Sequence, residues 1–120
     1  MARSWILAFA CFIFVCAVPA SAGNVPTLFG KVGPDFDITL KTSGGSNIKQ
    51  VTAGTYRIVV SDQSGDDNHN FRLKGFGVSR ATSVPFVGTR RWTVRFTRGK
   101  LYRFVCDPHA FVMRGSFKAV

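Results

Sequence analysis

Residues 101–115, which read LYRFVCDPHAFVMRG, combine a strand pattern with a tight turn. Side chains alternate between the two faces of a β-strand, so Tyr102, Phe104 and Cys106 are expected on one face. Pro108 restricts its own φ angle and donates no backbone hydrogen bond, which favours a turn directly after the cysteine. We therefore predict a strand that ends at the cysteine and a turn that leads into a last strand.

The same period of two, rather than the 3.6 residues of a helix, runs through the rest of the chain. Short glycine-, serine- and aspartate-rich segments separate the alternating runs. This pattern predicts an all-β fold, an antiparallel sandwich or barrel in a single domain. Strands are expected near residues 35–42, 55–61, 69–74, 91–96, 100–106 and 115–120, with a further one near 28–32.

The N-terminus has the composition of a secretory signal peptide. Arg3 precedes an apolar run over residues 5–18, and small residues suited to cleavage end at Ala22. The run is shorter than the roughly 20 apolar residues that span a bilayer, although a retained membrane anchor is the alternative. We predict that residues 1–22 are a signal peptide, and that residues 23–120 form a domain exported to the periplasm or the external medium.

Cleavage would remove Cys11 and Cys16 and leave Cys106 as the single cysteine of the exported domain. A lone cysteine cannot form an internal disulfide, although exported compartments permit one. His109 follows the cysteine by three positions, and Met113 comes four positions later. A thiolate, an imidazole and a thioether so close together form a soft ligand set that favours copper over magnesium, calcium or manganese.

His69 is the only other histidine, 37 positions before the cysteine. Two histidines and one cysteinate with a weak axial methionine make the blue-copper arrangement. The stretch from Tyr56 to Val120 resembles the small cupredoxins, such as plastocyanin, pseudoazurin and amicyanin, through His69-Asn70 and through Cys-Asp-Pro-His followed by Met and Gly. The resemblance implies a Greek-key β-sandwich with one mononuclear type 1 copper ion that carries single electrons.

The resemblance also assigns individual roles. The implied ligands are His69, Cys106 and His109 in the equatorial plane and Met113 on the axis. Asn70 matches the residue that ties the histidine-bearing loop to the cysteine loop in this family, and Pro108 is expected to stiffen the cysteine loop. Three residues separate His109 from Met113, whereas plastocyanins have a longer stretch there and amicyanins a shorter one.

Other functions stay open as alternatives. Zinc can occupy the same ligands, and a copper carrier without a redox partner or a metal-free extracellular interaction domain would have the same composition. Enzymatic chemistry is not expected. A Cys106–His109 nucleophilic pair would need an oriented base and an oxyanion hole, and the chain has no glutamate, with Asp107 as the only acid near the turn.

The charge is strongly positive and unevenly placed, with 16 Lys and Arg against 6 Asp and a net charge of +10. Residues 72–120 carry a net +10, whereas residues 23–71 carry a net −1. Arg91, Arg95 and Arg103 fall on outward strand positions, as in a solvated sheet face. The aromatic residues of the same strands point inward, which argues against nucleic-acid binding, where bases stack on exposed rings.

We therefore expect this protein to be a monomer and its partner to be an acidic redox protein. His109 lies on a turn, so an edge of its ring should reach the surface, with Phe111 and Val112 as an apolar rim. A weak association with an anionic membrane surface is a further expectation from the net charge.

Overall fold

The computed structural model describes residues 24–65 and 68–120, so the predicted signal peptide over residues 1–22 lies outside the described residues. In the described part the chain forms strands and a single turn of 3-10 helix, η1. Their bounds are β1 (Thr27–Val32), β2 (Ile38–Thr42), β3 (Gln50–Val51), β4 (Gly54–Asp62), β5 (Arg72–Gly75), β6 (Val78–Ala81), β7 (Gly88–Phe96), β8 (Leu101–Val105), η1 (Asp107–His109) and β9 (Arg114–Ala119).

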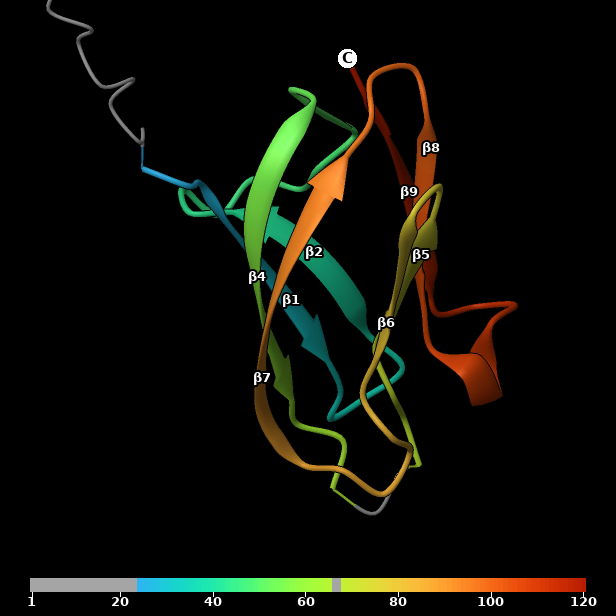
Figure 1. The fold of residues 1–120 in the computed structure, drawn as a ribbon. Coiled ribbons are helices and arrows are strands. Elements are labelled where there is room, and N and C mark those ends of the chain that lie inside the picture. Colours follow the sequence, from blue (N-terminus) through green and yellow to red (C-terminus); the bar gives the residue numbers. More distant parts are fainter. Residues whose placement is uncertain (1–23, 66–67) are drawn as a thin grey trace, which may run out of the picture.

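The strands form two sheets that face each other across one core (Figure 1). Sheet A has the order β2-β1-β4-β7, and sheet B has the order β3-β9-β8-β5-β6. Most neighbours are antiparallel, but β1 pairs with β4 and β3 pairs with β9 in parallel. The all-β prediction is confirmed. The prediction of a purely antiparallel arrangement is wrong, because two strand pairs are parallel. Parallel neighbours cannot be joined by a tight hairpin, so the chain must cross over between them.

Each of the seven predicted strands has a counterpart, and β3 and β6 were missed. The first of these has only two residues, and the second buries only Val78, so neither shows a clear alternation. The strand expected over 35–42 begins only at Ile38, and the strand expected over 69–74 begins only at Arg72. The alternation predicted a strand position for Phe36. This prediction is wrong, because the side chain lies in the loop before β2 and is 66% exposed.

The core consists of the inward faces of both sheets. Phe96, Tyr102 and Phe104 are buried as predicted, and the three outward arginines of β7 and β8 are exposed. The polar end of the Tyr102 ring is satisfied, since its hydroxyl oxygen accepts a hydrogen bond from the backbone N–H of Thr97 at 2.7 Å. A buried phenol thus packs in the core without an unpaired polar atom.

Gly115 lies directly opposite Phe104 in the β8–β9 pair, and a methyl group added there would overlap the aromatic ring. Gly115→Ala is therefore expected to lower the free energy of unfolding by about 1–3 kcal/mol, as overpacked positions do. Gly44→Ala is the matched control, because the nearest atom there is Thr42 Oγ1 at 3.8 Å. Urea unfolding measures both variants, and equal midpoints would contradict this packing.

Candidate metal centre

The cysteine loop is closed by backbone hydrogen bonds. Strand β8 ends at Val105, and Cys106 follows with its side chain between the sheets, 0% exposed. Its N–H donates to the carbonyl oxygen of Met113 at 3.0 Å, and its own carbonyl accepts from the N–H of His109 at 3.1 Å. The N–H of Met113 donates to the carbonyl of His109 at 2.8 Å. The predicted turn after the cysteine is thus present, and it returns His109 to the side of the sulfur.

His69 comes from the connection between β4 and β5 and is 0% exposed. The preceding residue, Asn68, has a φ of +53°, in the left-handed region that asparagine tolerates better than most residues. A buried carboxylate fixes the two ends of this connection. Asp62 accepts hydrogen bonds from the N–H and hydroxyl of Ser64 and from the hydroxyl of Thr82, whose oxygen accepts from the N–H of Phe71 at 2.9 Å.

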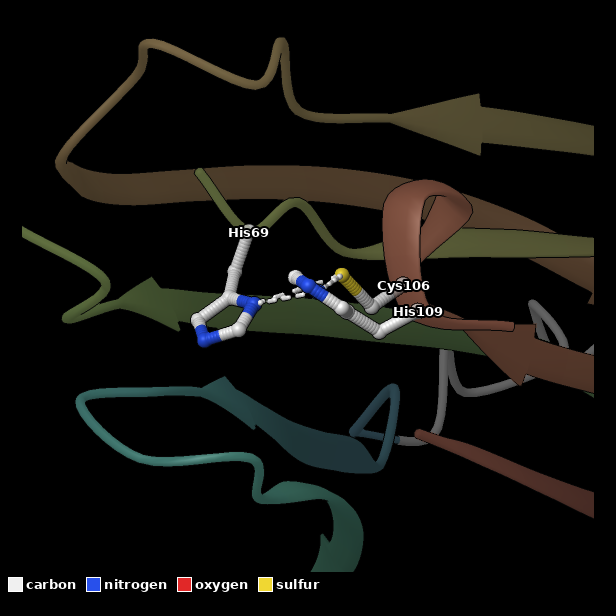
Figure 2. Close-up of side chains that lie close together, drawn as sticks. All are labelled: His69, Cys106 and His109. Carbon is white, nitrogen blue, oxygen red and sulfur yellow. Dashed lines mark hydrogen bonds between the residues drawn. The ribbon is translucent and has the colours of Figure 1, made fainter. Parts of the chain in front are cut away.

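Three side-chain atoms converge at this end of the sandwich (Figure 2). The sulfur of Cys106 lies 3.6 Å from the Nδ1 atom of His69 and 3.6 Å from the Nδ1 atom of His109. The two Nδ1 atoms are 3.0 Å apart. The sequence prediction that the tertiary fold brings together these three residues, up to 40 positions apart, is confirmed as geometry.

The triangle of donor atoms has the size of a metal site. A point equidistant from the three atoms lies about 2.0 Å from each, close to the roughly 2.0–2.1 Å of zinc–nitrogen bonds and somewhat short of the roughly 2.3 Å of zinc–sulfur bonds. A shift of a few tenths of an ångström at the sulfur would therefore suit a metal ion of this class. The His69–Cys106–His109 group can hold a metal ion, and the donor set is soft.

Known proteins add no assignment: a scan against protein-family models finds no match, and a search of the curated proteins finds no relative. The site therefore rests on its own geometry.

The fourth predicted ligand, Met113, is 0% exposed and packs in the core beside the cysteine loop. The backbone of Met113 is hydrogen-bonded to Cys106 and to His109, as described above. Met113 therefore belongs to the loop that carries two of the three converging atoms. Pro108 occupies the first turn of η1 and is exposed. Its missing N–H costs nothing there, because the first N–H groups of a helix have no intrahelical partner.

Asn70 ties the loop that carries His69 to the loop that carries Cys106. Its side-chain oxygen accepts from the N–H of Asp107 at 2.7 Å, and its amide nitrogen donates to the Asp107 carboxylate at 2.7 Å and to the carbonyl of Thr82 at 3.2 Å. In the sequence, His69 directly precedes Asn70, and Cys106 directly precedes Asp107. One buried amide, 2% exposed, thus fixes the positions of the loops that carry His69 and Cys106.

Arg72 completes this bridge, and sequence reasoning missed it. Its guanidinium donates to both carboxylate oxygens of Asp107 at 2.8 to 3.0 Å. These hydrogen bonds hold the pKa of Asp107 below its ordinary value and raise the pKa of Arg72. The only signal in the sequence was indirect, because Arg72 stands two positions after Asn70 and so lies on the same side of an extended chain.

Arg72→Met is expected to lower the free energy of unfolding by at most about 1 kcal/mol, because both charged groups are about one-third exposed and water screens the pair. The loss should shrink when the salt concentration rises to about 1 M, where the Debye length is about 3 Å. Urea unfolding at low and high salt measures the difference. A loss of the same size at both salt concentrations would mean that packing of the arginine stem, and not its charge, matters.

Phe36 is a second residue whose place at the site the sequence did not reveal. Its ring meets the ring of His109 edge to face, with centroids 4.8 Å apart, and that of His69 with centroids 5.4 Å apart. The loop between β1 and β2 thus places an apolar ring over both imidazoles.

Proposed function

We propose that the protein is an exported type 1 copper protein of the cupredoxin kind, which carries single electrons between redox partners. The observation that carries the proposal is the convergence of one cysteine sulfur and two imidazole Nδ1 atoms at one end of a β-sandwich. The two-sheet arrangement of crossing strands is compatible with a Greek-key cupredoxin. The proposal includes no catalytic role.

Copper fits this donor set better than a structural zinc ion does. Structural zinc sites are tetrahedral and use four strong ligands, whereas the described residues bring three histidine or cysteine donors together here. Three such donors in a plane with a weak thioether on the axis are the blue-copper arrangement, and Met113 is the thioether of the loop. We assign it the axial position.

A bound copper ion would supply a one-electron couple between Cu(I) and Cu(II). The chain contributes a ligand set that keeps its shape in both states, because His69 and Cys106 are fully buried and their loops are joined through Asn70. The Phe36 ring packs against both imidazoles. A rigid site would limit the rearrangement that accompanies each electron.

We place the electron port at His109, which is half-buried, unlike His69. Exposed apolar side chains surround it: Phe111 is 92% exposed, Val112 70% and Phe36 66%. Redox encounters use small interfaces, where an apolar centre permits close approach and surrounding charge sets the rate. Lys74, Arg103 and Arg114 line a depression that also includes Ala110, the residue after His109, and their positive charge suits an acidic redox protein.

Copper titration of the purified protein tests the proposal. One equivalent of Cu(II) should produce an intense visible band, and a reductant followed by an oxidant should remove and restore it. A colourless Cu(II) complex would contradict a type 1 site. A coloured complex that exchanges electrons with redox proteins only slowly would instead identify a copper carrier, and a preference for zinc over Cu(I) and Cu(II) would exclude both.

The axial assignment predicts the effect of Met113 on the potential. Met113→Leu is expected to retain copper and colour but to raise the reduction potential, since a weak donor that favours Cu(II) is lost. Met113→Gln should lower the potential, because the amide oxygen is a stronger donor to Cu(II). Protein voltammetry measures both, and unchanged potentials in the two variants would place the thioether in the core only.

A further inference from the structure

The outward face of sheet A is built from alternate residues of four strands (Figure 1). The strand register determines which side chains are neighbours on this face. Lys41 on β2 pairs with Phe29 on β1, Phe29 pairs with Val59 on β4, and Val59 pairs with Arg91 on β7. This row crosses the whole sheet, about 15 Å at roughly 4.8 Å per strand, with two apolar side chains between two cations.

The rest of this face repeats the same charge. Lys31, Arg57 and Arg95 occupy further outward positions on β1, β4 and β7, and the remaining outward side chains of the four strands are threonine and serine. No acidic side chain lies on this face among the described strands. Asp62, the one acid in these strands, is 1% exposed and points inward. Ordinary solvated faces mix both signs of charge, so five unopposed cations indicate an anionic partner.

The centre of the face is apolar and slightly hollow. Phe29 is 44% exposed. A depression of about 470 Å³ runs beside it, lined by Val59 and by the side chains of Lys31 and Lys41. A purely polar polyanion would leave this centre unused. A surface that is anionic at its boundary and apolar beneath it would contact both parts, with the lysine stems along the apolar floor.

We infer that the outward face of sheet A docks the protein on an anionic lipid bilayer. The five cations face the lipid headgroups, and Phe29 enters the boundary between headgroups and acyl chains. Sheet B also has outward cations, in Lys74, Arg103, Arg114 and Lys118. It is the less suitable face, because the carboxylate of Asp107 lies among them and pairs with Arg72, whereas the described strands of sheet A present no acid outward. Docking through sheet A leaves the η1 loop of sheet B free (Figure 1). The inference does not depend on the metal.

Vesicle binding tests the inference with the protein purified in its exported form, without metal. Partition coefficients are measured on vesicles of phosphatidylglycerol with phosphatidylcholine and on vesicles of phosphatidylcholine alone. Their ratio cancels any apolar binding by residues 5–18, should these be retained. The triple variant Lys41→Glu, Arg57→Glu, Arg91→Glu is expected to lower the ratio at least about 100-fold, since each cation near an anionic surface contributes about fivefold.

The matched control removes the same charge from sheet B through Lys74→Glu, Arg103→Glu and Arg114→Glu. It should keep the ratio within about threefold of the native protein. Equal losses in the two triple variants would mean that net charge alone binds the vesicles, and would overturn the inference. Circular dichroism in the near ultraviolet, where Trp92 and Tyr102 absorb, verifies the fold of both.

Phe29→Ser tests the apolar centre. It should lower binding several-fold, and the loss should persist when salt screens the cations, because burial of an aromatic ring is independent of ionic strength. If Phe29→Ser leaves vesicle binding unchanged, the face is only a polyanion site and the bilayer assignment is overturned. Retention on immobilised heparin without binding to anionic vesicles would have the same meaning.

Discussion

Cys106→Ser is expected to abolish the intense visible band of the protein loaded with Cu(II). That band arises from charge transfer between a coordinated thiolate and the metal, and a serine hydroxyl does not supply it. The substitution replaces one small side chain by another at a position that is 0% exposed, so the sandwich should still fold. Absorption spectra at equal copper loading measure the change.

Met113→Leu provides the control for the loss of a buried sulfur. Its side chain is also 0% exposed and belongs to the same loop, but the thiolate remains. The leucine variant should therefore keep the band that the serine variant loses. A serine variant that retains the band would exclude Cys106 as a ligand and remove the central observation behind the proposed function.

Asn70→Ala should weaken copper retention by about 10–100-fold, the usual effect of losing a residue that orients metal ligands. The substitution removes both hydrogen bonds to Asp107 and the one to Thr82, so the histidine loop and the cysteine loop lose their shared anchor. Copper transfer to a chelator, followed by the loss of the visible band, measures the dissociation rate.

Asn47→Ala is the matched control, since Asn47 is an exposed asparagine in the turn after β2 and lies outside the loops that carry the ligands. Its copper dissociation rate should equal that of the native protein. If both alanine variants release copper at the same rate, the bridge between the loops does not orient the ligands.

Two structural features explain why sequence reasoning was accurate in some regions and wrong in others. Strands such as β7 and β8 alternate strongly, with buried rings facing one way and arginines the other, so local pattern was sufficient. Phe36 continues the alternation of β2 in sequence but lies in a loop. Its surroundings are two imidazoles from distant segments, which no local pattern contains.

By itself, the sequence determined the all-β class, the inward rings of β7 and β8, the turn after Cys106 and the identity of the soft donors, because these depend on neighbours a few positions apart. Only the tertiary structure decided which atoms meet. The packing of the two sheets brings His69 to Cys106, and the pairing of β5 with β8 brings Arg72 to Asp107.

The distribution of charge shows the same division. Lys31, Lys41 and Arg57 come from residues 23–71, which carry a net charge of −1, yet they share one face of sheet A with Arg91 and Arg95. Strand order and register create that face, and both are set by burial of apolar surface between segments far apart in the chain. The spacing of residues along the chain does not show which distant strands pair.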